Sequence, residues 1–230
     1  MEKTMKKAMM VFAAAALAGS LVASAQEVLS ANAVGYVKRT IPAGQLQIVS
    51  VPFDNMASDD GLYTFGQTQI ANELPAKSVV MFWDAELQGW GAGTKGSKGW
   101  SAGQANHVLQ PGEAFFVKNT GTEDLEVTAA GEVPSDAELS RSFANGALGI
   151  MAYAFPVDVK FGDTELANML PQKSTVMFWD ENLQGWGAGT KGSKGWSAGQ
   201  ANYVVRAGEG FFIKPAADGT WVAEKPYTWP

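Results

Sequence analysis

The sequence predicts an all-β protein made of two homologous antiparallel modules, each a β-sandwich or barrel-like unit with one short helix. Three observations lead to this fold class: a long internal repeat, many short runs rich in β-branched and aromatic residues, and only two short helical patterns. With 230 residues, of which 46% are hydrophobic and 11% aromatic, the chain has enough apolar surface to bury a core.

The repeat is strongest in one glycine-rich stretch. Residues 87–106 read LQGWGAGTKGSKGWSAGQAN, and residues 183–202 read the same twenty letters, at an offset of 96. The same offset continues on both sides, where 71–84 matches 167–180 and 111–118 matches 207–214. Identity over the central stretch has two open explanations, which are a shared functional demand on both copies and recent gene conversion.

The repeat also indicates where the modules begin and end. Further upstream the offset becomes 102 and pairs Arg39 with Arg141 and Leu46 with Leu148, so the first copy carries six extra residues. A boundary near residues 133–135 divides the chain into module 1 (26–133) and module 2 (134–230). Two units are too few for an open solenoid, which needs three or more.

Strands and helices are predicted from local patterns in each copy. Runs rich in valine, isoleucine or aromatics, bounded by Gly, Pro, Asn or Asp, predict strands at 45–53, 78–84, 114–119 and 125–129. Helical patterns occur at 67–74 and 163–170, and each is ended by a proline, Pro75 or Pro171.

The N-terminus has the layout of a secretory signal peptide. Residues 1–25 combine a basic start, an apolar stretch from Met9 to Val22 and the ending Ala23-Ser24-Ala25. The apolar stretch is shorter than the roughly 20 residues that span a bilayer. We therefore expect cleavage after Ala25, a secreted or periplasmic location, and no membrane-spanning segment after cleavage.

Composition and charge exclude several classes of protein. The absence of cysteine excludes disulfide scaffolds, zinc-thiolate sites and thiol nucleophiles. Cleavage would remove three of 17 basic residues and one of 23 acidic residues, which leaves a formal net charge of −8. Such a surface repels phosphate backbones, so we expect no nucleic-acid partner.

Three segments carry a resemblance to a group of proteins. The Asn-Ala-Val-Gly-Tyr-Val run at 32–37, the Phe-Trp-Asp run at 82–84 and the Pro-Gly-Glu-Ala-Phe-Phe run at 111–116 resemble those of uncharacterised exported bacterial β-rich proteins. The likeness covers most of the chain after the signal peptide. It implies a β fold and export, and it carries no catalytic residue, because the group has no known activity.

Short matches to catalytic motifs fail on their context. Gly-x-Ser-x-Gly occurs around Ser101 and Ser197, but the only histidine, His107, follows Ser101 by six residues and its counterpart is Tyr203. The Gly-x-Gly-x-x-Gly match at 91–96 does not open a helix, as a dinucleotide site requires. We therefore expect no catalytic serine and no cofactor.

Carboxylates also have structural interpretations that we favour. The pairs Asp84 with Glu113 and Asp180 with Glu209 are candidates for glycoside hydrolysis, but aspartates at strand ends and glutamates after glycine are typical of turns. The aspartates near residue 60 lack the ligand spacing of an EF-hand, so we expect no metal site.

The tryptophans of the repeated stretch are the main functional candidates. Trp90 and Trp100 bracket the segment GAGTKGSKG, and Trp186 and Trp196 do so in the second copy. Exposed indoles beside hydrogen-bonding groups suit the apolar faces of sugar rings, whereas the alternative is that they pack over the open ends of a small β-core.

The function that follows is an exported, non-enzymatic binding protein that recognises a polysaccharide or a cell-surface component. The alternative is a structural cell-envelope protein whose partner is another copy of itself. The expected ligand-binding residues are Trp90, Lys95, Lys98, Trp100, Gln104 and Asn106, together with their copies Trp186, Lys191, Lys194, Trp196, Gln200 and Asn202.

Overall fold

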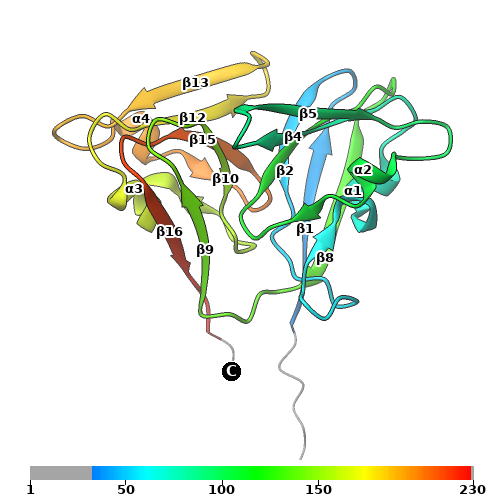
Figure 1. The fold of residues 1–230 in the computed structure, drawn as a ribbon, viewed down its shortest axis with the longest axis horizontal. Helices are drawn as coiled ribbons and strands as arrows, with labels where there is room; N and C mark the ends of the chain where they lie inside the picture. Colours follow the sequence, from blue (N-terminus) through cyan, green and yellow to red (C-terminus); the bar gives the residue numbers. More distant parts are fainter. Residues whose placement is uncertain (1–32, 229–230) are drawn as a thin grey trace, which may run out of the picture. The chain divides into compact units, whose positions relative to one another are not determined.

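The computed structural model describes residues 33–228, and these residues form an all-β fold with short helices (Figure 1). Residues 33–228 belong to one compact unit. The expected signal peptide, residues 1–25, lies outside the described residues. Among residues 33–228, no helix has the length and apolar character needed to cross a bilayer.

The same order of elements occurs in both halves of this unit, which we call the first repeat (up to residue 133) and the second repeat (from residue 134). The first repeat contains β1 (Val34–Ile41), β2 (Leu46–Ser50), β3 (Tyr63–Thr64), the 3-10 turn η1 (Phe65–Gln67), α1 (Gln69–Glu73), β4 (Val79–Asp84), β5 (Gly89–Thr94), α2 (Ala102–Ala105), β6 (Val108–Leu109), β7 (Ala114–Lys118) and β8 (Leu125–Glu132). The second contains β9 (Glu138–Phe143), β10 (Gly149–Ala152), β11 (Val159–Lys160), η2 (Phe161–Asp163), α3 (Glu165–Met169), β12 (Thr175–Asp180), β13 (Gly185–Thr190), α4 (Ala198–Ala201), β14 (Val204–Val205), β15 (Gly210–Lys214) and β16 (Gly219–Glu224).

Each repeat is built around a four-stranded antiparallel sheet. The strand order is β2-β7-β4-β5 in the first repeat and β10-β15-β12-β13 in the second. Two antiparallel two-stranded ribbons complete each repeat. They are β1-β8 and β3-β6 in the first repeat, and β9-β16 and β11-β14 in the second. Because side chains alternate along a strand, one face of each four-stranded sheet can serve the core of its own repeat while the other face is free for a second contact.

The first face of each sheet packs into a core within its own repeat. In the first repeat Val80 and Phe82 of β4 join Phe115 and Val117 of β7, and Phe65 meets Phe82 and Phe115 edge to face. The corresponding core of the second repeat includes Phe161, Val176, Phe178, Phe211 and Ile213. Each core also receives one face of the short helix α1 or α3.

Local sequence explains why the helices begin and end where they do. The Thr68 hydroxyl accepts a hydrogen bond from the Ala71 N–H at 3.1 Å, and Thr164 does the same with Ala167 at 3.1 Å, so each threonine caps a helix N-terminus. The helices end before Pro75 and Pro171, as the sequence predicts.

The second face of the two sheets forms a hydrophobic cluster that is shared between the repeats. Ile48 and Phe116 from the first repeat pack with Ile150, Trp179 and Phe212 from the second. This shared cluster explains why the two halves form one compact unit. The expected module boundary itself stays a prediction.

Backbone hydrogen bonds join the repeats at equivalent places. The Ser50 N–H donates to the Gly208 carbonyl at 2.9 Å, and the Ala152 N–H donates to the Gly112 carbonyl at 2.8 Å. Gly210 lies at a close approach of the two repeats, because a Cβ atom there would be 2.3 Å from the Ala114 Cβ. Two methyl groups do not fit in this space.

A glutamine from each hairpin tip holds the edge of the other repeat. The Gln88 side chain accepts from the Leu148 N–H at 2.7 Å and donates to the Leu148 carbonyl at 3.1 Å. Gln184 makes the equivalent pair of bonds with Leu46, at 2.8 and 3.2 Å. Both glutamines have positive φ, 48° and 46°, in the turns that they close. These side chains satisfy backbone groups at the sheet edges β2 and β10.

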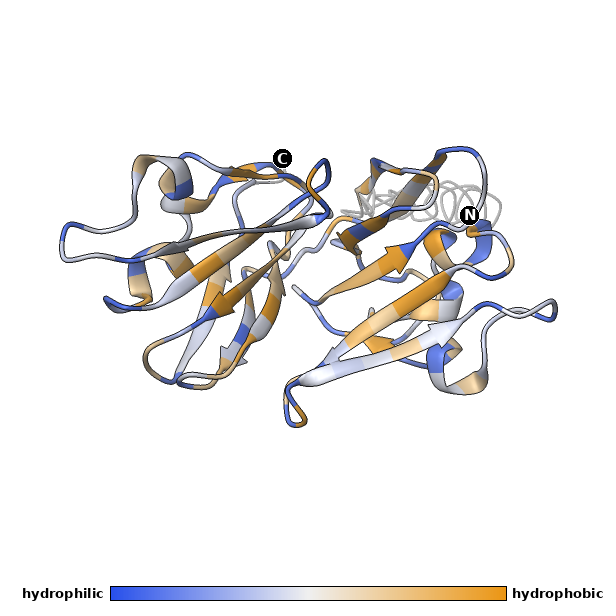
Figure 2. Ribbon diagram, turned by 90° about the horizontal axis from the view of Figure 1, so that it is seen from above, coloured by the Kyte–Doolittle hydropathy of each residue, from blue (hydrophilic) through white to orange (hydrophobic). Residues whose placement is uncertain are grey.

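Two features of the predicted fold need correction. The glycine-rich segment expected as a loop begins as a strand, because residues 89–94 form β5 and pair with β4 along their whole length. Each repeat also has two short α-helices rather than one, since α2 and α4 follow the repeated tryptophans. Figure 2 shows the glycine-rich strands β5 and β13 in pale colours, in contrast to the hydrophobic strands beside them.

Candidate binding site

The second tryptophan of each repeated stretch packs inward. Trp100 Nε1 donates to the Ala71 carbonyl at 2.9 Å, and Trp196 Nε1 donates to the Ala167 carbonyl at 2.9 Å. The Trp100 ring meets Phe65 edge to face at 5.1 Å between centroids. Each of these indoles bonds a carbonyl of α1 or α3 through its N–H and packs against a core phenylalanine through its ring. These contacts hold the helix against the core of its repeat.

The first lysine of each stretch also has internal partners. Lys95 Nζ donates to the carbonyls of Ala71, Asn72 and Leu74 at 2.8, 2.9 and 2.6 Å. Lys191 makes the same three contacts in the second repeat, with Ala167, Asn168 and Leu170. These carbonyls end the helices α1 and α3, where a cation is favoured by the helix dipole. Desolvation by burial lowers the pKa of both lysines.

The remaining expected residues divide between structural positions and open surface. Gln104 accepts a hydrogen bond from Ser101, as Gln200 does from Ser197. The Gln104 side chain also occupies the space beside Gly93, where a Cβ would lie 2.2 Å from it. The exposed residues of this group are Lys98, Lys194, Asn106 and Asn202, and the two asparagines end the helices α2 and α4.

Trp90 and Trp186 differ from every other tryptophan in residues 33–228. They lie on β5 and β13 and are 39% and 38% exposed. Within those residues, the indole N–H groups of the other five donate to a carbonyl or carboxylate oxygen. No partner for the indole N–H of Trp90 or Trp186 occurs in that part of the chain.

These two indoles belong to one cluster at the junction of the repeats. Trp90 lies 5.3 Å from Phe116 and 5.7 Å from Phe212, and Trp186 lies 5.7 Å and 5.0 Å from the same two rings. Each exposed indole also meets its strand partner, Trp83 or Trp179, at 5.1 Å. We call the six rings of Trp83, Trp90, Phe116, Trp179, Trp186 and Phe212 the aromatic platform.

The expected site residues are therefore only partly brought together. Trp90 joins the shared cluster through Phe116, whereas Trp100 packs on the separate core of the first repeat. The structure adds Phe116 and Phe212, which support both exposed indoles and are themselves 3% and 4% exposed. The repeat shows that Trp90 and Trp186 are equivalent, but no sequence signal predicts that they contact the same phenylalanines, because this depends on how the repeats pack.

The second repeat also has an open polar groove of about 460 Å³ on β12 and β13. Its lining includes Asp180, Glu181, Gln200, Tyr203, Arg206 and Glu209. The Tyr203 ring stacks on Phe178 at 3.8 Å, and its hydroxyl donates to Glu209. Burial, and then the Glu209 carboxylate, raise the pKa of this tyrosine.

Residues of the short catalytic-motif matches make hydrogen bonds within the fold. His107 Nε2 lies 2.8 Å from Glu113 Oε1, and Ser101 bonds Gln104 instead of this histidine. Asp84 accepts two backbone N–H bonds, at 2.9 and 2.8 Å, in the turn after β4, as expected for an aspartate at a strand end. Residues 33–228 contain no cluster of three or more potential metal ligands.

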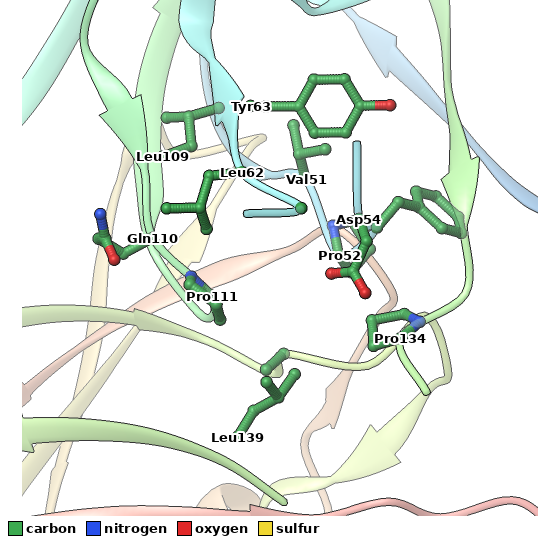
Figure 3. A pocket seen from close by; sticks show the side chains of 13 residues that line it. Val51, Pro52, Asp54, Leu62, Tyr63, Leu109, Gln110, Pro111, Pro134 and Leu139 are labelled. Carbon is green, nitrogen blue, oxygen red and sulfur yellow. The ribbon is translucent and has the colours of Figure 1, made fainter. Parts of the chain in front are cut away.

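A small pocket lies between the β2–β3 connection and residues 109–111 (Figure 3). Asp54 lines it beside Pro52 and Tyr63, and the cavity holds only about 20 Å³, enough for one water molecule. Burial, with repulsion from Asp136 and Glu132, raises the pKa of Asp54 to about 6. The pocket is too small for a ligand, but the Asp54 carboxyl group affects the stability of the fold.

Comparison with protein-family models, curated proteins and solved structures finds no match for this chain. The function must therefore be inferred from the site alone.

Proposed function

We propose that this chain is an exported, non-enzymatic binding protein that recognises a glycan or another cell-surface partner through Trp90 and Trp186. The observation that carries the proposal is a pair of exposed indoles on one aromatic platform. Their N–H groups have no hydrogen-bond partner among residues 33–228. Sugar rings offer apolar C–H faces to an aromatic ring and hydroxyl groups to an indole N–H.

The aromatic rings packed against the two exposed indoles favour binding. Each exposed ring rests edge to face against two phenylalanines and one tryptophan, so its orientation is set before a ligand arrives. Because Trp90 and Trp186 share Phe116 and Phe212, we expect them to act as one extended surface on the same glycan chain. Two contacts on one chain strengthen retention on a repetitive surface.

The proposal is tested by retention on insoluble polysaccharides and by a glycan array. We expect wild-type protein to be retained and the double variant Trp90→Ala/Trp186→Ala to lose about tenfold or more in affinity, because aromatic hot spots contribute most of such binding energy. The matched control is Leu87→Ala/Leu183→Ala, which removes two exposed apolar side chains from the same hairpins and should bind normally. Absence of retention on every polysaccharide, or equal loss in both double variants, would count against the proposal.

Self-assembly is the second candidate function, and a separate observation favours it. Strands β5 and β13 are the outer strands of their sheets, and the adjacent hairpin tips carry Leu87 and Leu183, each 80% exposed. Size-exclusion chromatography with light scattering distinguishes the two functions. Oligomers that disappear in Leu87→Lys/Leu183→Lys would support assembly, and a monomer at high concentration would exclude it.

A further inference from the structure

The two ends of the junction between the repeats differ in the side chains that lie near an equivalent arginine. Glu181 follows β12 in the second repeat, and Ala85 stands at the equivalent place after β4 in the first. Glu181 Oε1 accepts a 2.5 Å hydrogen bond from Gln47 Nε2 and lies 4.0 Å from a guanidinium nitrogen of Arg39. The Arg39 side chain is only 10% exposed and this nitrogen makes no hydrogen bond, so at this end the protein places a carboxylate at ion-pair distance from a largely buried cation.

The other end has the cation without this carboxylate. Arg141 is the equivalent of Arg39, and Gly149 is the equivalent of Gln47. Throughout residues 33–228, no carboxylate oxygen lies within 4.0 Å of the Arg141 guanidinium. Arg141 and Ala85 instead line a cavity of about 350 Å³.

The shape and lining of this cavity define what it can hold. Its walls are mainly apolar and include Trp83, Phe143, Ile150 and Met151. Its volume falls within the range of small-molecule sites, in which a few polar groups orient a largely apolar ligand. Trp83 is fixed in place because its N–H donates to the Leu148 carbonyl at 3.0 Å.

We propose that this cavity, which we call the Arg141 cavity, binds a small organic carboxylate with an apolar body. The ligand carboxylate takes the place beside Arg141 that Glu181 takes beside Arg39, and the apolar body packs against Trp83 and Met151. This site is distinct from the exposed indoles of the proposed function, although Trp83 contacts both.

The electrostatics of the cavity are consistent with an anionic ligand. Desolvation by burial lowers the pKa of Arg141, and Glu113 opposes this change. Glu113 is already engaged, because its oxygens lie 2.8 Å from His107 Nε2 and 3.0 Å from the donating Gln110 N–H. A carboxylate that enters the cavity therefore meets a guanidinium that has no carboxylate oxygen within 4.0 Å among residues 33–228, and Glu113 acts on this cation only from a longer distance.

The test is a titration of the ¹⁵N-labelled chain with benzoate at pH 7, followed on the indole N–H resonances. We expect benzoate to shift the Trp83 resonance to saturation, and benzyl alcohol, which has the same body without the charge, to bind at least about tenfold more weakly. The variant Ala85→Glu should abolish the response by supplying an internal carboxylate. The control Ala92→Glu adds the same charge at an exposed position on β5, outside the cavity, and should leave the response intact.

A gain of binding at the opposite end completes the test. The double variant Glu181→Ala/Gln47→Gly recreates the Arg141 arrangement around Arg39, so benzoate should then also shift the Trp179 resonance. The indole resonances of the remaining tryptophans report whether each variant is folded. An unshifted Trp83, an equal response to benzyl alcohol, or a persistent response in folded Ala85→Glu would overturn the proposal.

Discussion

Replacing Gly210 by alanine should destabilise the protein at the point where the two repeats meet. The added Cβ would lie 2.3 Å from the Ala114 Cβ, far inside the 3.4–4 Å of ordinary van der Waals contact. Ala114 is fully buried in the shared cluster, so the backbone of β7 or β15 must move. Overpacking of this kind destabilises by about 1–3 kcal/mol.

A second substitution distinguishes this contact from a general effect. Ala114→Gly alone should destabilise by about 1–2 kcal/mol, through a lost buried methyl group and a more flexible unfolded chain. The double variant Ala114→Gly/Gly210→Ala moves the methyl group to the other side of the same contact. Independent effects would sum to about 2–5 kcal/mol, whereas the double variant should lose less than this sum, because the contact with the Ala114 methyl group disappears and only the 2.9 Å approach to the Ile48 side chain remains.

Urea unfolding of the four proteins measures this coupling as a free energy, and thermal unfolding measures it as Tm. We expect one cooperative transition for the unit that contains residues 33–228, with the Tm of Gly210→Ala lower than wild type by about 2–12 °C and that of the double variant higher than that of Gly210→Ala. A double variant that loses the sum of the single effects would show that positions 114 and 210 do not touch, and the reasoning about the junction would fail.

Three further predictions follow from individual side chains. Lys95→Met removes three hydrogen bonds to the end of α1 and should destabilise the protein by about 1–3 kcal/mol in urea unfolding. The control Lys98→Met, at an exposed position, should change stability by less than about 0.5 kcal/mol. Equal effects of the two variants would contradict the capping role of Lys95. Asp54 has a pKa of about 6 when folded against 3.8 as an ordinary carboxyl group, so the folded state binds its proton more tightly and stability is lost as pH rises from about 4 to 6. Asp54→Asn should therefore have a higher Tm than wild type above pH 6 and the same Tm below about pH 4, and a difference that does not vary with pH would refute this. Among the seven tryptophans of residues 33–228, Trp90→Phe/Trp186→Phe should remove most of the fluorescence that acrylamide quenches, and an unchanged accessible fraction would show that other indoles are the exposed ones.

Many strands could be predicted from the sequence because their signals are local. The run at 78–84 alternates between the two faces of a sheet and becomes β4, and the run at 114–119 becomes β7. Helix ends were also predictable, since Pro75 and Pro171 cannot continue a helix. Strand β5 was missed because its three glycines have low strand propensity, and it forms through pairing with β4.

The candidate site was predictable only in part, because it depends on contacts between distant segments. Trp90 is exposed because of its place on β5, and Trp100 is partly buried against α1, but the sequence predicted a loop in which neither difference could be foreseen. Lys95 is a polar residue in a glycine-rich segment, and only the position of α1 shows that it caps a helix. The difference between Ala85 and Glu181 was visible in the repeat, but its meaning required Arg39 and Arg141 from the opposite repeats.

The most direct test of the account is an NMR titration of the labelled chain with soluble fragments of a polysaccharide that retains it. We expect the indole N–H resonances of Trp90 and Trp186 to shift together, and those of Trp100 and Trp196, which are hydrogen-bonded inside the protein, to stay unchanged. Shifts confined to Trp100 and Trp196, or no shift at any indole while the fragment binds, would contradict the proposal that the aromatic platform is the binding surface.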